Sequence, residues 1–320
     1  MNRLPFILFF STFLILSLPL SAQTKSLPDF TIQLKQNFSI DNLLNYEEVE
    51  AVIVGNTLSE KGIKLTLNLD ESFTARNKQC KLPVLKANFP KKRLKGSLLE
   101  GFNKVEIILN CDSTGVYTSL DKLLLEAWFY KLSGFFFRFE PRVQLVNLKI
   151  EGLTDKAIPA LFIESPDDMA SRYEGRNLEI HLMQPWLLDQ EALAEFVIFQ
   201  YFTGNTCWAL ETLHSMILLS VPGRPPVPFP WDHSCARLLK EPFAAGFYTC
   251  FKSPCVQKDV LQLVIASLNR SRSDILQSIE SMHFSNSDLK EELRQYTLKF
   301  IETMNNPDFI QHLGISCPEE

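Results

Sequence analysis

The segment from Phe199 to Leu219, FQYFTGNTCWALETLHSMILL, places reactive side chains directly after a strongly apolar stretch. Cys207 could act as a thiolate nucleophile, with His214, seven residues later, as its base. That chemistry needs hydrogen-bond contact and an activated thiolate, and spacing alone indicates neither. We favour the alternative, in which Cys207 is a buried thiol and His214 holds backbone groups. Asn205 lies in the same loop and adds an amide oxygen.

The composition is typical of one or two packed domains. The chain has 320 residues, of which 46% are hydrophobic and 22% charged, and this balance argues against disorder. A net charge of −5 gives no general attraction to nucleic acid. The basic run Lys91-Lys92-Arg93-Leu94-Lys95 is interpreted as a solvated loop. We therefore expect no nucleic-acid partner.

The N-terminus has the pattern of an export signal. Arg3 precedes the apolar stretch Leu4–Leu20, and the small residues Ser21 and Ala22 follow it. This pattern predicts a signal peptide over residues 1–22, cut after Ala22. The mature protein would then be periplasmic or extracellular. The alternative is an uncleaved N-terminal membrane anchor, because the apolar stretch approaches spanning length.

Export changes the interpretation of the seven cysteines, because an oxidising compartment allows them to pair. They are Cys80, Cys111, Cys207, Cys235, Cys250, Cys255 and Cys317. An odd number leaves at least one cysteine unpaired in a monomer. No spacing resembles a zinc knuckle, so we expect no metal site. Cys250 and Cys255 could form a short-loop bridge, but pairings with Cys235 or Cys317, or simple packing, stay open.

The first half of the chain, from about residue 30 to 163, has the pattern of strands around one helix. Strands are expected at Ile63–Leu69, Lys104–Asn110 and Val143–Ile150. A helix is expected at Ser119–Leu132, with Gly134 just past its end. The phenylalanine-rich stretch Phe135–Phe139 is interpreted as core.

The second half is expected to be mainly helical. Ser165-Pro-Asp-Asp168 is interpreted as a loop, and Gln190–Phe202 as a buried helix, because it is apolar on most faces. Val256–Met282 and Ser287–Met304 are expected to form two amphipathic helices, and the proline-rich stretch 221–235 a loop. These patterns predict a strand-rich N-terminal lobe over residues 23–164 and a helical C-terminal lobe over residues 165–320.

This order of elements is that of a protein kinase, and several stretches resemble exported bacterial proteins related to the CotH-type atypical kinases. The stretches that carry the resemblance are Cys80–Phe89, Gly96–Gly101, Lys104–Cys111, Leu123–Leu132, Phe162–Arg172, Phe199–Ser215 and Val227–Asp232. The resemblance covers about residues 57–250. It implies an α+β, bilobal, protein-kinase-like fold. It also favours a disulfide between Cys80 and Cys111, which match the family pattern and flank strands of one predicted sheet.

Phosphoryl transfer in such a fold depends on positioning and charge neutralisation. A strand lysine holds the phosphates, and a helix glutamate orients that lysine. Glu126 fits the glutamate, but Glu106 stands where the lysine is expected. Lys104, two residues earlier on the same strand face, could replace it only in another register. Because the strand lysine that Glu126 would orient is replaced by Glu106, Glu126 is better interpreted as a structural carboxylate.

The remaining catalytic positions are also replaced. Cys207 stands at the position of the catalytic aspartate, Ser215 at that of a metal-binding asparagine, and Pro230 at that of the first metal-binding aspartate. Asp232 keeps the second carboxylate, or simply turns the loop after the prolines. The resemblance thus implies a degenerate site with no catalytic residue and no cofactor. We expect Glu106 and Glu126 to face Cys207 and Asp232 across the space between the lobes.

We therefore expect an exported pseudokinase-like protein that binds or scaffolds without phosphotransfer. Its partner would be an envelope or extracellular protein, or a small ligand in the former nucleotide cleft. One alternative is an active atypical ATP-dependent kinase with displaced residues. The candidates for that role are Lys104, Glu126, Asn205, His214 and Asp232. The other alternative is an envelope structural protein that uses only its outer surface.

Overall fold

The computed structural model describes residues 27–35, 39, 41–42, 45, 48–55, 58, 62–69, 84–90, 94–109, 119–180, 182–205, 208–233, 236 and 256–313. The predicted signal segment and all seven cysteines lie outside these residues, so the Cys80–Cys111 disulfide stays a prediction. Within the described ranges, no helix combines the length and apolar character needed to cross a membrane.

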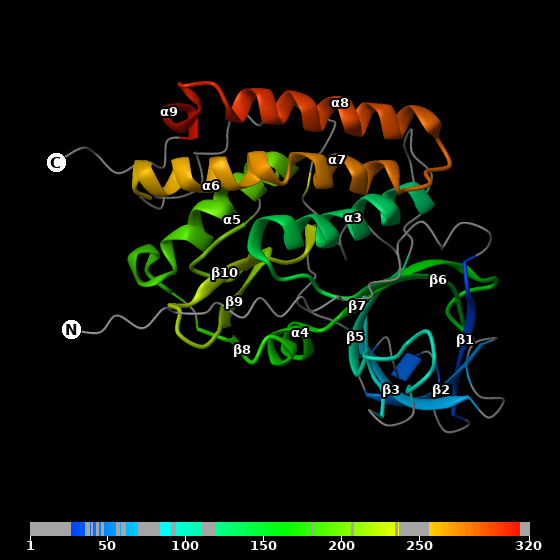
Figure 1. The fold of residues 1–320 in the computed structure, drawn as a ribbon. Coiled ribbons are helices and arrows are strands. Elements are labelled where there is room, and N and C mark those ends of the chain that lie inside the picture. The colour runs from blue at the N-terminus through cyan, green and yellow to red at the C-terminus, as the bar shows by residue number, and fades with distance from the viewer. Residues whose placement is uncertain are drawn as a thin grey trace, which may run out of the picture.

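The fold is mixed α/β, with a closed seven-stranded barrel in the first half of the chain (Figure 1). Its strands are β1 (Asp29–Leu34), β2 (Val49–Gly55), β3 (Ile63–Leu69), β4 (Leu85–Asn88), β5 (Lys104–Leu109), β6 (Val143–Ile150) and β7 (Ile158–Glu164). They follow the order β1-β2-β3-β4-β5-β7-β6. Neighbours are antiparallel except β1 and β6, whose parallel pairing closes the barrel. The strands predicted at Ile63–Leu69 and Val143–Ile150 are confirmed, and the one predicted at Lys104–Asn110 is confirmed as far as Leu109, the last described residue of that stretch.

The barrel interior is a hydrophobic core of its own. Alternate residues of β2 point inward, so Val49, Ala51 and Ile53 are fully buried, as a period of two requires. Phe30 of β1 stacks on Phe162 of β7 with ring centroids 6.4 Å apart. This core fixes the register of the strands. That register places several polar side chains together on one outer side of the barrel.

Helix α3 (Ser119–Phe137) lies between β5 and β6 in the chain, and its predicted end at Leu132 is wrong. The helix continues through Gly134, although glycine costs a helix about 1 kcal/mol relative to alanine. The extension buries Phe136 and Phe137, and burying each such side chain is worth about 1.5–3 kcal/mol. Burial therefore outweighs the glycine signal. Arg138, with φ 60°, takes the left-handed position after the helix.

The second half contains helices and a three-stranded sheet of order β10-β9-β8. Its elements are α4 (Pro166–Arg172), β8 (Arg176–Leu178), η2 (Pro185–Leu187), α5 (Gln190–Thr203), β9 (Met216–Ser220), β10 (Val227–Pro230), α6 (Lys258–Arg270), α7 (Arg272–Glu280), α8 (Ser287–Met304) and α9 (Phe309–Leu313). The predictions for α5 and α8 are confirmed. Helices α6, α7 and α8 lie together on the far side of α3 and α5 from the small sheet (Figure 1).

Three expectations for this half are wrong. Ser165 is the N-cap of α4 rather than part of a longer loop, and its Oγ accepts a hydrogen bond from the Asp168 amide (3.2 Å). The proline-rich stretch contains β10, which tolerates its prolines because it is an edge strand. The helix expected over 256–282 divides at Ser271 into α6 and α7. Trp128 of α3 fixes α7 by donating from Nε1 to Ser278 Oγ (2.9 Å).

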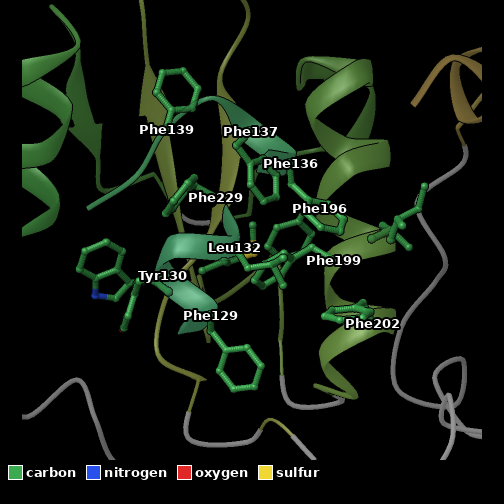
Figure 2. Close-up of a cluster of buried hydrophobic side chains, with 14 of the residues drawn as sticks. Phe129, Tyr130, Leu132, Phe136, Phe137, Phe139, Phe196, Phe199, Phe202 and Phe229 are labelled. Atoms are coloured by element: carbon green, nitrogen blue, oxygen red, sulfur yellow. The ribbon is translucent and has the colours of Figure 1, made fainter. Parts of the chain in front are cut away.

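The largest core is built from aromatic side chains of α3 and α5 (Figure 2). Phe199 of α5 meets Phe136 edge-on at 5.2 Å and Phe137 at 5.8 Å between centroids. Phe137 also contacts Phe229 of β10 at 5.2 Å. The expectation that Phe135–Phe139 forms core is confirmed for its phenylalanines, apart from the partly buried Phe135, while Arg138 is exposed. The buried helix expected at Gln190–Phe202 contributes to the same core. This core joins α3 to the second half of the chain.

Phe199→Ala should lower the free energy of unfolding by about 3–5 kcal/mol, because it leaves a cavity among three aromatic rings. Urea denaturation measures this loss. Leu263→Ala on α6 is the control, since Leu263 is 67% exposed and its change should stay within about 0.5 kcal/mol. Equal effects of the two substitutions would contradict this assignment of the core.

Glu195 of α5 should make stability depend on pH. Burial raises the pKa of its carboxyl from 4.5 to about 8; repulsion from Glu191 adds to this, and Arg224 opposes it. The folded protein therefore holds a proton that the unfolded chain has already released in this range. Stability should fall as pH rises from 4.5 to about 8. Urea denaturation across that window should show a flatter dependence for Glu195→Gln. The exposed control Glu211→Gln should keep the wild-type slope.

Candidate functional site

A cleft of about 620 Å³ lies between the barrel and the small sheet of the second half. Its barrel wall comes from the outward faces of β3, β4 and β5. Its other wall comes from β8, the start of β9 and the segments beside them. The residues that contribute polar side chains are Asn68, Lys86, Asn88, Lys104, Glu106, Ser165, Asp167, Asn177, Glu179, Thr212, His214, Ser215 and Asp232. Both walls thus carry polar side chains among apolar ones, unlike the two cores on either side.

One buried hydrogen bond crosses this cleft. Glu106 of β5 is only 4% exposed, and its Oε2 accepts from Trp231 Nε1 at 3.0 Å. Trp231 follows β10, and its indole ring packs edge-on against Tyr130 of α3 at 5.5 Å. At position 106, where the resemblance to kinases leads us to expect a phosphate-binding lysine, the chain therefore has a carboxylate that is hydrogen-bonded to an indole. Glu106 lines the cleft, as expected.

Ser215 and Asp232 lie beside this bond. The Trp231 amide donates to the Ser215 carbonyl (3.2 Å), and Asp232 is the next residue in the chain. Their side chains line the cleft and are nearly buried, at 5% and 6% exposed. Glu106, Ser215 and Asp232 together are called the cleft floor below. The Ser215 Oγ has no hydrogen-bond partner in the described part of the chain.

The backbone of the floor is in an unusual conformation. Leu213, Ser215 and Asp232 all line the cleft and have φ of 53°, 54° and 54°. This left-handed region is uncommon for residues other than glycine, and most of all for leucine. Such conformations tend to gather at functional sites, where the surrounding structure holds them.

Sequence analysis missed Lys86. The register of β4 and β5 places Lys86 directly opposite Glu106, and Asn88 opposite Lys104. All four residues line the cleft. The alternation in Leu-Lys-Ala-Asn of β4 could have indicated that Lys86 and Asn88 share a polar face. Its pairing partner could not be read, because register depends on the whole sheet.

Lys104 is engaged at the junction between barrel and second half. Its Nζ lies 3.4 Å from Asp167 Oδ2, with both side chains more than half exposed. Its backbone amide donates to Asp168 Oδ2 (2.7 Å), and its carbonyl accepts from the Ser165 amide (2.9 Å). Lys104 therefore lies at the rim of the cleft. Its contacts bind the start of β5 to the start of α4.

The other candidates divide between the cleft and the interior. His214 lines the cleft, while its backbone pairs with Ala209. Glu126 is buried on α3 and is not among the residues that line the cleft. Cys207 lies outside the described residues, so the expectation that Glu126 faces it stays a prediction. Asn205 is fully buried just beyond Gly204, the left-handed C-cap of α5.

Pro230, the last degenerate position, ends β10 just before Trp231 and is buried. It has no side-chain oxygen for a metal. No group of three or more His, Cys, Asp or Glu side chains that could hold a metal occurs among the residues that the structure describes. The described charges lining the cleft are two lysines, Lys86 and Lys104, and four carboxylates. The carboxylates are Glu106, Asp167, Glu179 and Asp232.

The Trp231–Glu106 bond should be measurable by a double-mutant cycle. Trp231→Phe removes the indole donor and should cost about 1–3 kcal/mol of stability, because Glu106 is buried. Glu106→Gln keeps an acceptor oxygen without the charge. Urea denaturation of both single variants and the double variant should give a coupling energy of about 1 kcal/mol or more. Strictly additive effects would show that this bond does not link the two halves.

Comparison with models of known protein families gives no match for this chain, and no curated protein matches it significantly in sequence.

Proposed function

We propose that this chain is an exported, pseudokinase-like binding protein whose cleft takes a small ligand and does not transfer phosphate. The same molecule could serve as a scaffold for an envelope or extracellular protein. The proposal rests on the residues of the cleft and on the order of the elements around them.

The arrangement of elements supports a kinase-like, bilobal reading. Helix α3 is inserted between β5 and β6, while the sheet order is β5-β7-β6. The chain then passes from β7 through Ser165 to α4 and the second half, and the cleft lies at this passage. This is the order in which a kinase places its lysine strand, its orienting helix and its lobe junction. The closure of the barrel by β1 is not part of this kinase-like order of elements.

The observation that carries the loss of phosphotransfer is the buried Trp231–Glu106 hydrogen bond (3.0 Å). A triphosphate needs cations around it, whereas this position presents a carboxylate. The described lining also carries more carboxylates than lysines. Pro230 offers no metal ligand. Phosphate binding is therefore disfavoured both by charge and by the missing metal side chains.

An active kinase with displaced residues is supported less well. That alternative needs Lys104, Glu126 and Asp232 to converge on one substrate. Lys104 instead pairs with Asp167 at the rim, and Glu126 does not line the cleft. Lys86 is the only other described lysine of the lining, and it lies opposite a glutamate. A purely structural role gives no reason for a buried Ser215 hydroxyl that lines the cleft and has no partner among the residues that the structure describes.

Titration of the purified protein with ATP, with and without magnesium, tests this proposal. We expect no saturable binding and no phosphotransfer. Glu106→Lys alone should not create kinase activity, because Cys207, Ser215 and Pro230 still stand at the base and metal positions. The combined variant with Glu106→Lys, Cys207→Asp, Ser215→Asn and Pro230→Asp places the expected kinase residue at all four positions. It is the fuller test of whether this cleft is a degenerate kinase site.

Magnesium-dependent phosphotransfer by the unmodified protein, abolished by Asp232→Ala, would overturn the proposal. The matched control is Asp167→Ala, which removes an exposed carboxylate at the rim of the same cleft. Activity that survives both substitutions would indicate a contaminating kinase and would leave the expected result in place.

A further inference from the structure

Most of the charged side chains that line the cleft already have partners within the protein. Lys104 Nζ lies 3.4 Å from Asp167 Oδ2. Glu106 accepts a hydrogen bond from an indole N–H at 3.0 Å. The other lining charges that have contacts within the protein are Lys86 and Asp232. A charged ligand would have to replace such contacts, and removing the partner of a buried charge is costly.

Several amide, hydroxyl and imidazole side chains of the lining form no hydrogen bond with the residues that the structure describes. Each of these groups can both donate and accept a hydrogen bond. They are Asn68, Asn177, Thr212, His214 and Ser215. Glu179 also lines the cleft, but it is exposed, so water and salt screen its charge. The hydrogen-bonding capacity that a ligand can use is therefore mostly that of amides and hydroxyls.

Ser215 is the buried member of this group and indicates a ligand independently. Its side chain lines the cleft at 5% exposure, and its Oγ has no partner in the described part of the chain. A buried hydroxyl without a partner is costly, and a ligand that exchanges a hydrogen bond with it removes that cost. The backbone of Ser215 has φ of 54°, a conformation that tends to occur at functional sites.

A saccharide matches this lining better than an ion or a nucleobase does. Each hydroxyl of a sugar donates and accepts, as the amides and hydroxyls of the lining do. A nucleobase needs an aromatic face on which to stack, but Trp231 is only 5% exposed and packs against Tyr130. The C–H faces of a sugar can instead contact Leu178 and Leu213, which also line the cleft. We propose that the cleft binds a neutral saccharide.

The size of the cleft and the position of its hydrogen-bonding groups indicate more than one sugar ring. A volume of about 620 Å³ lies within the range for drug-sized ligands, which includes a disaccharide. Asn68 belongs to β3 on the barrel wall, whereas Asn177 belongs to β8 and Ser215 directly precedes β9 on the other wall. A ligand that bonds to both walls must span the cleft, which favours a disaccharide over a single ring.

This inference rests on the proposed function, in which the cleft is a ligand site. The experiment is a ligand-detected NMR titration of the whole mature chain with maltose, cellobiose and lactose. At least one of the three should bind saturably. Its 1-phosphate keeps both rings and adds negative charge, and it should bind about tenfold more weakly, because the lining offers that charge no free partner. Trialanine is the peptide probe and should not bind.

Two substitutions on opposite walls test the position of the sugar. Ser215→Gly removes the hydroxyl, and glycine adopts the left-handed backbone without strain. Asn68→Ala removes an amide from the barrel wall. Each should weaken binding of the disaccharide by several fold, the usual effect of one lost hydrogen bond. Ser273→Ala is the control, because Ser273 is exposed on α7 and is not among the residues of the lining. It should leave the affinity unchanged.

Thermal unfolding shows whether each variant is folded, and either wall substitution is decisive if the other variant does not fold. The proposal is overturned if none of the three disaccharides binds, if the 1-phosphate binds as tightly as the neutral sugar, or if neither wall substitution weakens binding. Binding of trialanine without binding of a disaccharide would assign the cleft to peptides and would also overturn it. These results would leave the absence of phosphotransfer intact, whereas magnesium-dependent phosphotransfer would overturn the proposed function itself.

Discussion

The position of the cleft depends on one buried carboxylate, that of Glu164 at the end of β7. Its side chain is 1% exposed and accepts from Arg172 Nε and Nη2 at 3.2 and 2.7 Å, and from the Arg142 amide at 3.0 Å. Arg172 also donates to the Glu140 carbonyl and lies over the Tyr173 ring. A buried charge must be paired in this way, and removing one partner of such a pair typically costs about 3–5 kcal/mol. The contacts fix the direction in which the chain leaves the barrel. As a result, Ser165, Asp167 and Asp168 lie beside Lys104, where they form the rim of the cleft.

The two halves of the molecule are held together by a shared hydrophobic core as well as by ion pairs. Helix α3 belongs to the first half in sequence, yet its aromatic side chains lie in the same core as α5, α7 and β10. The barrel has a separate core. A shift of α3 would therefore disturb Tyr130, which contacts Trp231 and His233, and through Trp231 the carboxylate of Glu106. The floor of the cleft is held between the barrel core and the core around α3. This packing on both sides accounts for the unfavourable backbone angles that occur there.

Local patterns predicted most elements but fewer of the contacts. Alternation identified β3 and, more loosely, β6, and apolar character on most faces identified α5. The end of α3 was missed because the burial of Phe136 and Phe137 is a tertiary effect that the Gly134 signal does not include. Glu106 and Asp232 were singled out through a resemblance to kinase-like proteins, and both line the cleft. Lys86 was missed because it became relevant only through the register of β4 with β5. The parallel pairing of β1 with β6 joins segments over 100 residues apart, as in Asp29 and Asn147, and no local pattern indicates it.

That parallel pairing has a consequence for how the chain folds. Strand β1 can find its second neighbour only after β6 has been synthesised, because Phe30 aligns with Leu148. Contacts of such sequence separation form slowly, since loop-closure entropy is lost before they contribute. Until closure, β1 and β6 present open edges on which another chain could pair. Closure of the barrel pairs these two edges with each other, so the finished fold no longer offers them to another chain.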